Sequence, residues 1–326
     1  KDGKKVCYNP WTHFEVNNPN GDVTMCCDNP IVLGNVNEQS IEEIWNGKPY
    51  QDVRKKMYAL GGEKMCNPDC LLLNGAKNNE SLADYQKIDN ETKCYKNSLQ
   101  NEAEIRDGET VLRSKPRLTR FLVSYACNFT CYHCDQVPKR KLGLKLPEKF
   151  FSEAKSLLEY SQILYLFGGE PMVFAEFRDF LNIGNRYPHL KYGIVSNGSL
   201  IHKHIDQIRN ANWSFISISL DAATEETFEE MRGSKSWGRV MDNLQELSNL
   251  KKSKNFRLII CMTVNSKNYN EIYKFVELAK KFMAIPAINI VTNSVGTDEF
   301  ENEFLTFDSR KRKRILDLVN KIKNDF

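Results

Sequence analysis

From Arg117 onward the chain alternates short apolar runs with amphipathic runs, and this rhythm constrains the fold most strongly. Six apolar runs of strand length are each followed by a segment of helical periodicity. The expected strands are 118–124, 163–167, 191–196, 215–220, 257–264 and 287–292, and the expected helices are 147–160, 174–187, 201–210, 224–250, 269–282 and 309–323. Such alternation predicts an α/β fold with a parallel sheet covered by helices.

Six strand–helix units fit either a partial (β/α)6 barrel of the TIM type or an open doubly wound sheet. Periodicity alone does not separate these two architectures. In both, ligands bind at the carboxyl ends of the strands. The polar residues that follow the expected strands are therefore the candidate site.

The segment before this core has a different composition. Residues 1–96 are rich in Asn, Gly and Pro and contain six of the 10 cysteines. Within them, Ser40 and Glu43 have the spacing of a capping box at a helix start. The polar stretch 97–116 is expected to be a linker. The sequence thus predicts a small cysteine-rich domain (1–96), a linker (97–116) and an α/β core (117–326).

Composition narrows the class of protein. The net charge is only +4, too low for a general nucleic-acid footprint, and the basic run 310–314 is expected to be a solvated helix start. The first ten residues lack the apolar core of a secretion signal, and no run is long enough to span a membrane. We therefore expect a cytoplasmic protein with no membrane or nucleic-acid partner, in which cysteines serve as metal ligands or catalytic thiols.

The loop after the first core strand contains Cys127, Cys131 and Cys134 in the spacing C-x3-C-x2-C. Three close thiolates favour a soft metal or a cluster. A four-iron cluster normally takes four cysteines, so three leave one iron open for chemistry. A zinc site is the alternative.

This spacing, with a ring just before the last cysteine, resembles the signature of the radical S-adenosylmethionine (AdoMet) superfamily. The resemblance implies a [4Fe–4S] cluster whose open iron binds AdoMet. It also implies reductive cleavage of AdoMet to a 5′-deoxyadenosyl radical, which abstracts a substrate hydrogen atom. His133 stands where the family has Phe, Tyr or Trp, and its ring is expected to pack against adenine.

Polar residues at later strand ends extend the resemblance. A Gly-Gly-Glu-Pro loop follows the second strand, Ser-Asn-Gly ends the third, Ser-Ile-Ser-Leu-Asp spans the fourth, and an Arg-Gly pair comes after it. The resemblance implies AdoMet contacts from Gly168, Gly169, Glu170, Pro171, Ser196, Asn197, Ser217, Ser219, Asp221 and Arg232. Strand-end capping, or a solvated surface position for the arginine, is the alternative.

Cys261 shares one face of the fifth strand with Thr263 and Asn265, because side chains alternate along a strand. If that face lines the barrel, its thiol is a candidate hydrogen donor to a substrate radical, as in some epimerases of the superfamily. A buried structural cysteine is the alternative.

In the N-terminal segment, the Asn20-Gly21-Asp22 string predicts a hairpin turn that brings Cys26 back toward Cys7. Cys66 and Cys70 complete a set of four thiols. The Cys7, Gly21 and Cys26 pattern resembles the SPASM and twitch domains, here placed before the core. The resemblance implies an auxiliary [4Fe–4S] cluster on Cys7, Cys26, Cys66 and Cys70. Cys27 and Cys94 are alternative ligands, and zinc is the alternative metal.

These features lead to a functional expectation. The resemblance implies a radical AdoMet oxidoreductase or maturase that modifies a peptide or protein substrate oxidatively, with a flavodoxin- or ferredoxin-type reductant. The alternative within the family is a dehydrogenase or epimerase of a sugar or aminocyclitol. An alternative of another class is a non-catalytic iron–sulfur or zinc-stabilised protein that carries electrons or binds a partner.

Overall fold

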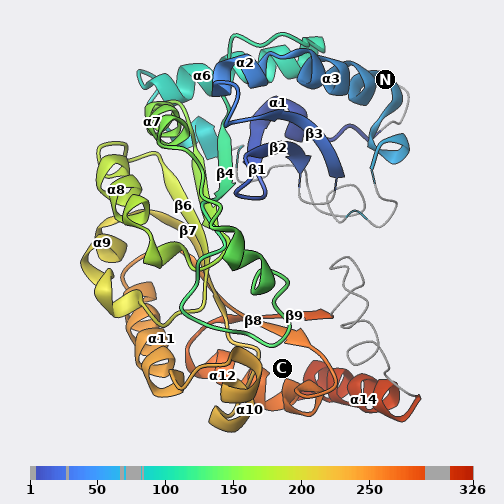
Figure 1. Ribbon diagram of the computed structural model, residues 1–326, viewed down its shortest axis with the longest axis vertical. Coiled ribbons are helices and arrows are strands. Elements are labelled where there is room, and N and C mark those ends of the chain that lie inside the picture. Colours follow the sequence, from blue (N-terminus) through green and yellow to red (C-terminus); the bar gives the residue numbers. More distant parts are fainter. Residues whose placement is uncertain are drawn as a thin grey trace. The chain divides into compact units, whose positions relative to one another are not determined.

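The computed structural model describes residues 5–26, 29–66, 70, 82, 84–290 and 309–325 (Figure 1). The chain forms two compact units. The first comprises Lys1–Ser124, Leu144–Gly168 and Glu176–Tyr192, and the second comprises Tyr125–Gly143, Gly169–Ala175 and Gly193–Phe326. These units cut across the domains 1–96 and 117–326 expected from the sequence, because the first strands and helices of the expected core pack with the N-terminal segment. The domain boundaries themselves stay a prediction.

The strands of the first unit form a mixed arrangement. They are β1 (His13–Val16), β2 (Asp22–Cys26), β3 (Asn29–Asn35), β4 (Leu118–Leu122) and β5 (Ile163–Phe167), in the order β3-β2-β1-β4-β5. β1–β2 and β2–β3 pair antiparallel, whereas β1–β4 and β4–β5 pair parallel. The expected hairpin turn is confirmed, with Gly21 at a φ of 93° that favours glycine.

Helices of this unit cover the strands. They are α1 (Asn9–Thr12), α2 (Ile41–Trp45), α3 (Lys48–Leu60), α6 (Lys93–Asp107), α7 (Glu148–Leu157) and most of α8 (Ala175–Gly184), with short 3-10 turns at Gly62–Lys64 and Asp84–Lys87. The predicted capping box starts α2: the Ser40 hydroxyl accepts the Glu43 N–H, and the Ser40 N–H donates to the Glu43 carboxylate. In Figure 1, α3 lies beside β3, on which it packs.

Aromatic rings fill the space between β4 and its helices. The Phe121 ring on β4 lies 5.1 Å from that of Phe150 on α7 and 5.3 Å from that of Phe180 on α8. All three side chains are buried. Aromatic pairs at these centroid distances add to the free energy of burial, so this cluster anchors the predicted strand–helix units.

The expected linker 97–116 differs from the structure, because α6 occupies Lys93–Asp107. Thr92 caps the helix start. The polar residues that suggested a linker are buried and hydrogen-bonded instead: Asn101 donates to the Trp11 carbonyl at 2.8 Å, and the Glu104 carboxylate accepts the Ser114 hydroxyl. Polar composition therefore indicated solvent exposure where it serves buried hydrogen bonds.

The chain passes into the second unit along β6 (Lys191–Ser196) and continues with three strands in the order β7-β8-β9. These are β7 (Trp213–Ser219), β8 (Arg257–Val264) and β9 (Ile285–Ile290), all paired parallel. The helices are α9 (Ile205–Asn210), α10 (Glu225–Arg232), α11 (Trp237–Lys251), α12 (Ile272–Lys281) and α14 (Ser309–Asp325). Short 3-10 turns occupy Pro138–Leu142, Pro171–Val173, Ile201–Lys203 and Tyr269–Glu271.

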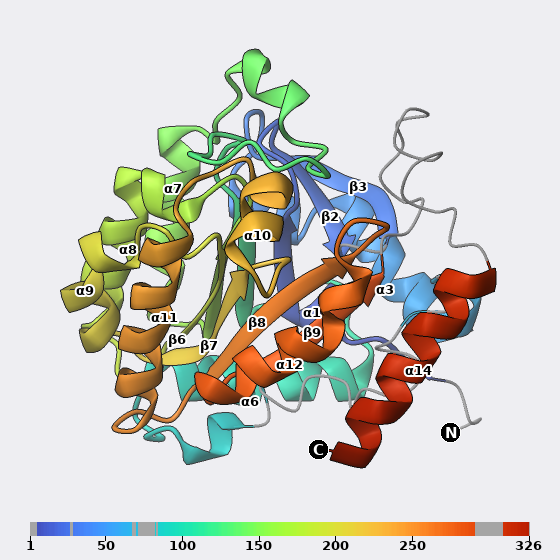
Figure 2. The ribbon, with the colours of Figure 1, turned by 90° about the horizontal axis from the view of Figure 1, so that it is seen from below.

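Strand β8 shows how the second unit is layered. Leu258, Ile260 and Met262 are fully buried, and α11 and α12 pack against this strand (Figure 2). The alternate residues on the opposite face, Cys261 and Thr263 among them, are only partly buried. One face of the strands therefore forms the core, and the other is accessible to a ligand.

The α/β class and the predicted parallel strands are confirmed. β5, β6 and β8 have the expected bounds, and the long helix expected over 224–250 breaks at Gly233, whose φ is 58°. β9 starts at Ile285, two residues before the expected strand, and residues 291 and 292 lie outside the described part. Among the described residues, no helix combines the length and apolar character that crossing a membrane requires.

Candidate functional site

The loop of residues 127–134, called here the cysteine loop, contains the three predicted ligands. Cys131 is buried, and Cys127 and Cys134 are partly buried. Burial raises the pKa of Cys131 to about 11; the Arg232 guanidinium lowers it, whereas Cys134 and Cys127 raise it further. The three thiols are thus close enough to interact electrostatically. A cluster or soft metal would relieve this crowding by replacing their protons.

The end of α10 holds the cysteine loop in place. The Tyr132 N–H donates to the Met231 carbonyl at 3.0 Å, and the Thr130 hydroxyl donates to the Gly233 carbonyl at 3.2 Å. A Cβ at position 233 would lie only 2.5 Å from the Thr130 carbonyl oxygen. Glycine at this position, at positive φ, therefore permits the close approach of helix end and loop.

The Gly-Gly-Glu-Pro loop follows β5, as expected. Gly168 has a φ of 80°, and a Cβ there would lie 1.8 Å from the Leu122 Cγ. Gly169 donates its N–H to the Gln136 side chain at 2.8 Å, and Glu170 donates its N–H to the Ala126 carbonyl at 2.9 Å. The backbone of this loop is thereby tied to residues on both sides of the cysteine loop.

The Glu170 carboxylate is fully buried and faces the third strand end. It accepts the Asn197 N–H at 2.7 Å, the Met172 N–H at 3.2 Å and the Ser196 hydroxyl at 2.9 Å. Burial raises the pKa of Glu170, and these donors lower it in part. The carboxylate therefore orders the Ser-Asn-Gly segment, a role that the sequence did not indicate.

Asn197 connects this segment to the cysteine loop. Its Nδ2 donates to the Asn128 side chain at 2.9 Å and lies 3.7 Å from the Cys127 Sγ, which it contacts as a donor. Its Oδ1 accepts the Ser199 hydroxyl. The predicted residues Asn197 and Cys127 are thus direct neighbours.

Asp221 lies at the centre of the site. Its backbone has a φ of 62°, which is unusual for a residue with a side chain. Its carboxylate accepts the Arg232 guanidinium at 2.6 Å and the Thr263 N–H at 2.7 Å, and it lies 3.3 Å from the His133 Nε2. Burial alone would raise the pKa of Asp221, but Arg232 and His133 hold it well below its usual range.

Two predicted cofactor contacts have buried nitrogen atoms without a hydrogen-bond partner among the described residues. They are the Nδ1 of His133 and the Nε of Arg232. Leaving a buried polar atom unsatisfied costs about 1–3 kcal/mol. Both atoms are next to the cysteine loop, so a polar ligand bound there would satisfy them.

Cys261 and Ser217 meet on the accessible face of β7 and β8. The Sγ and the Oγ are 3.1 Å apart. Ser219 lies in register with Cys261 across the parallel pair, so their side chains share this face. Burial raises the pKa of Cys261, and the Ser217 hydroxyl lowers it in part, so the thiol keeps its proton at neutral pH. Cys261 is partly exposed rather than a fully buried structural cysteine.

The N-terminal cysteines also converge. Burial raises the pKa of Cys7 to about 11, and Cys66 and Cys70 raise it further, which places the three thiols near one another. Cys26 ends β2 opposite Asn29, whose side chain donates to the Met65 carbonyl at 3.1 Å. Cys26 is thereby connected to the segment that contains Cys66.

The two alternative ligands have different outcomes. Cys27 lies outside the described residues. Cys94 is fully buried on α6, and its Sγ donates to the Ser161 carbonyl at 3.6 Å. Burial raises the pKa of Cys94 to about 12. A thiol held in this protonated state is poorly suited to ligate a metal.

Two residues of the site were missed by sequence reasoning. Gln136 follows the cysteine loop and holds Gly169, and Asn268 donates to the Asp221 carbonyl at 2.9 Å. Gln136 lies two residues after Cys134, which is the only signal that could have indicated it. Asn268 had none, since only the fold brings it to Asp221.

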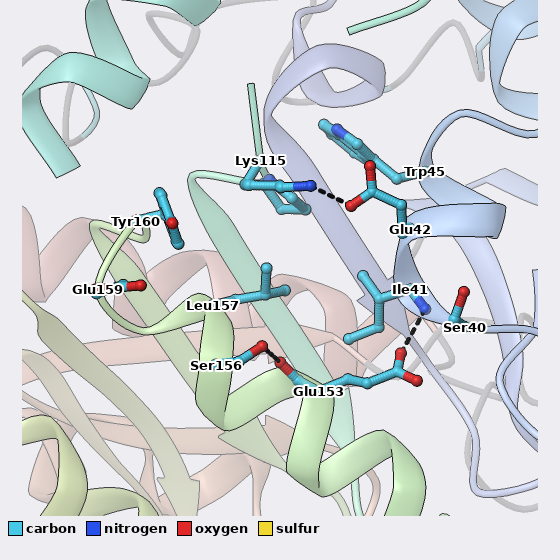
Figure 3. A pocket seen from close by; sticks show the side chains of 11 residues that line it. Ser40, Ile41, Glu42, Trp45, Lys115, Glu153, Ser156, Leu157, Glu159 and Tyr160 are labelled. Carbon is cyan, nitrogen blue, oxygen red and sulfur yellow. Dashed lines mark hydrogen bonds and ion pairs between the residues drawn. The ribbon is translucent and has the colours of Figure 1, made fainter. Parts of the chain in front are cut away.

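A separate cavity of about 310 Å³ lies in the first unit beside α2 and α7. Figure 3 shows the Ile41 and Leu157 side chains directed toward one another within it, and the ion pair of Lys115 with Glu42. Glu153 accepts the Ile41 N–H at 2.7 Å. No residue predicted for the site lines this cavity.

Comparison with known proteins assigns the family. Residues 121–279 match the model of the Radical SAM superfamily, and residues 7–71 match that of an iron-sulfur cluster-binding domain, SPASM. The chain belongs to the radical SAM superfamily. The SPASM domain precedes the radical SAM core, as the sequence predicted. Its cofactors are therefore a [4Fe–4S] cluster with AdoMet and an auxiliary iron–sulfur cluster.

Curated relatives share part of this radical SAM chain. An AdoMet-dependent heme synthase of Methanosarcina barkeri is 30% identical over 180 residues, covering 53% of this chain and 50% of the relative. The mycofactocin maturase MftC of Mycobacterium tuberculosis is 26% identical over 193 residues, covering 58% and 48%. The chain thus spans about half the length of these relatives.

Solved structures share the fold. Streptococcus suis SuiB bound to S-adenosylmethionine superposes with a TM-score of 0.52 at 13% identity, covering 99% of this chain and 71% of that one. The structure titled anSMEcpe with bound AdoMet gives a TM-score of 0.51 at 16% identity, covering 65% and 59%. These likenesses support the TIM-like fold of the radical SAM core.

The donor atoms fit these cofactors. Thiols are the ligands that iron–sulfur clusters take, and each predicted set consists of thiols. Among the described residues, no three His, Cys, Asp or Glu side chains are grouped tightly enough to hold one metal ion. The fit to a cluster therefore rests on thiol chemistry and on the mutual pKa effects within each set. The fit to AdoMet rests on the unsatisfied nitrogens of His133 and Arg232.

Proposed function

We propose that this radical SAM enzyme binds its AdoMet-cleaving cluster through Cys127, Cys131 and Cys134. The observation that supports this most directly is the electrostatic interaction of the three thiols in one loop beside Arg232. When bound, the cluster and AdoMet supply a radical that abstracts a substrate hydrogen atom. The protein's own residues hold the loop, order the strand ends and exclude water.

For AdoMet, we propose contacts from the predicted strand-end residues, with two adjustments. The Glu170 carboxylate is engaged by Ser196 and Asn197, so the Gly168–Pro171 loop would contact AdoMet chiefly through its backbone. Arg232 is paired with Asp221, so its unsatisfied Nε is the part available to a ligand. The other contacts stay as predicted: His133, Ser217, Ser219 and Asp221.

An auxiliary cluster on Cys7, Cys26, Cys66 and Cys70 is the second part of the proposal. The interaction of Cys7 with Cys66 and Cys70 supports it. Such a cluster would accept an electron from the substrate radical, making the net reaction an oxidation. We propose a flavodoxin- or ferredoxin-type protein as the reductant and a reducing cytoplasm as the location, because neither cluster tolerates oxidants.

We propose a peptide or protein substrate. The mycofactocin maturase among the relatives and the structure of SuiB bound to precursor peptide SuiA support this class, although each describes another protein. The partly exposed face of β8 offers an accessible surface in the second unit. Oxidation of a sugar or aminocyclitol is the competing substrate class.

Cys261 favours a second candidate reaction, epimerisation. Its partly exposed thiol, 3.1 Å from the Ser217 hydroxyl, is suited to give a hydrogen atom to a substrate carbon radical. That step forms a C–H bond, breaks the S–H bond and leaves a thiyl radical, which an electron from the reductant and a proton would restore. An epimerase would incorporate one solvent deuterium per product, and Cys261→Ala would abolish this, whereas an oxidative enzyme would not depend on the thiol.

The first experiment is a count of iron and acid-labile sulfide after anaerobic reconstitution. Two four-iron clusters predict about eight irons per chain, falling to about four when Cys127, Cys131 and Cys134 are all changed to Ala. About four irons falling to none, with zinc present, would keep the enzyme but make the N-terminal site structural. No iron in a folded chain would refute the proposal.

Product analysis separates the enzyme from a non-catalytic iron–sulfur protein. Under reducing, oxygen-free conditions the enzyme would form 5′-deoxyadenosine from AdoMet, and the triple Cys→Ala variant would not. An intact cluster without AdoMet cleavage would favour an electron carrier. The matched control is Cys94→Ala, which removes a buried thiol outside both proposed sets.

A further inference from the structure

His133 has one nitrogen bound and one free among the described residues. Its Nε2 lies 3.3 Å from the Asp221 Oδ2, whereas its Nδ1 is buried without a partner. The imidazole side chain is only 16% exposed, so water cannot easily satisfy this nitrogen. A phenylalanine at this position would leave no such atom.

The partner of Nε2 determines what Nδ1 can do. Asp221 is held ionised by Arg232, and an ionised carboxylate only accepts hydrogen bonds. Nε2 therefore carries the proton in the neutral imidazole, and Nδ1 is an acceptor. Its missing partner is a group that donates an N–H or O–H.

Asp221 is itself fixed in position. The Thr263 N–H donates to its Oδ1, Arg232 donates to its Oδ2, and the Asn268 side chain donates to its backbone carbonyl. Its left-handed backbone conformation costs about 1–3 kcal/mol and persists only where the surroundings enforce it. This carboxylate is thus a rigid support for His133.

We propose that Asp221 is a positioning residue that holds His133 so that Nδ1 accepts a hydrogen bond from an N–H or O–H group of bound AdoMet. The inference rests on the proposed function, in which AdoMet binds at the cysteine loop. It adds a side-chain hydrogen bond to the ring contact expected from the sequence. His133 then contributes to selection of the cofactor by polarity as well as by shape.

The test is AdoMet affinity, measured without reductant so that no cleavage occurs. The reconstituted protein is titrated with AdoMet, and the change in the cluster absorbance gives Kd. His133→Phe keeps a ring but removes Nδ1, and we expect Kd to rise about 3- to 10-fold, the worth of one hydrogen bond. Asp221→Asn should give a similar rise. Exposed His202→Phe is the matched control and should leave Kd unchanged.

Coupling distinguishes positioning from a separate role. Because Asp221 acts through His133, the double variant should bind AdoMet no more weakly than His133→Phe alone. Iron content is measured in every variant, so loss of the cluster is separated from loss of the hydrogen bond. If Asp221→Asn loses iron, His133→Phe alone decides. Unchanged Kd in His133→Phe with full iron would overturn the inference, whereas a wild-type chain that binds no AdoMet would refute the proposed function instead.

Discussion

The Nδ2 of Asn197 lies 3.7 Å from the Sγ of Cys127 and donates to it. A residue of the third strand end thus contacts a proposed cluster ligand on the loop after β4. Hydrogen bonds to ligating sulfur stabilise the more negative, reduced state of a cluster. The separation in sequence is 70 residues, so only the parallel arrangement of strands brings the two together.

Removing this contact should lower the reduction potential of the cluster. We expect Asn197→Ala to shift the midpoint potential by about 40 mV to more negative values, which corresponds to about 1 kcal/mol for one electron. Redox titration followed by electron paramagnetic resonance measures it. Ser199→Ala removes a hydroxyl bound to Asn197 but keeps the Nδ2–Sγ contact, and should leave the potential in place. Equal shifts in both variants would contradict this role.

The buried carboxylate of Glu170 should matter for stability. Glu170→Gln places an amide N–H2 opposite backbone donors, and we expect the free energy of unfolding to fall by about 1–3 kcal/mol. Anaerobic chemical denaturation measures the change. Glu148→Gln is the control, because that side chain is 85% exposed and its loss should be nearly neutral. A Glu170→Gln protein as stable as wild type would mean that the carboxylate does not order the loop.

Gly168 should not tolerate a side chain. An alanine Cβ would meet Leu122 at 1.8 Å and would have to adopt a φ of 80°, so we expect Gly168→Ala to cost about 2–4 kcal/mol. Gly238→Ala is the matched control, because nothing lies within 4 Å of its Cβ position on helix α11. It should be neutral or slightly stabilising. Thermal denaturation of both proteins compares them, and equal melting temperatures would refute the steric argument.

His13 should make the stability depend on pH. Burial, with Arg120 and Arg117 nearby, lowers its pKa to about 3, whereas the unfolded chain has an ordinary value near 6.5. The unfolded state therefore binds the proton first, and stability falls as pH drops below about 6.5. One unit lower, the loss is about 1.4 kcal/mol.

Denaturation at pH 7.5 and pH 5.5 under anaerobic conditions measures this loss. His13→Gln should reduce the difference between the two pH values by about 1 kcal/mol, since the titrating group is gone. His202→Gln, which removes an exposed imidazole, should leave the difference unchanged. A pH dependence that persists in His13→Gln would have to come from other groups.

Two buried cysteines of the first unit should behave differently toward iron. Cys7→Ala is expected to lose the auxiliary cluster, about four irons per chain, whereas Cys94→Ala should keep all of them. Both side chains are nearly inaccessible, so general damage from a small cavity is matched. Iron analysis of the two proteins decides. Iron loss in Cys94→Ala at full stability would make Cys94 a ligand.

Local pattern predicted most of the elements. The apolar runs at 163–167, 191–196 and 257–264 match β5, β6 and β8, because a short buried strand is recorded directly in its own residues. The Ser40–Glu43 capping box was readable for the same reason. Helix α6 was missed because its buried Asn and Glu side chains have polar letters, and only their distant partners reveal burial.

The sequence by itself determined the chemistry. The cysteine spacing, the Gly-Gly-Glu-Pro loop and the alternating strands and helices indicated a radical SAM core with a SPASM domain, since ligand type and local spacing are properties of adjacent residues. The tertiary structure decided the partners. Parallel pairing of β1 with β4, the Asp221–Arg232 ion pair, and the contacts of Asn268 and Gln136 all join residues distant in the chain. Such contacts depend on the closure of long loops around a shared core, and no local pattern records them.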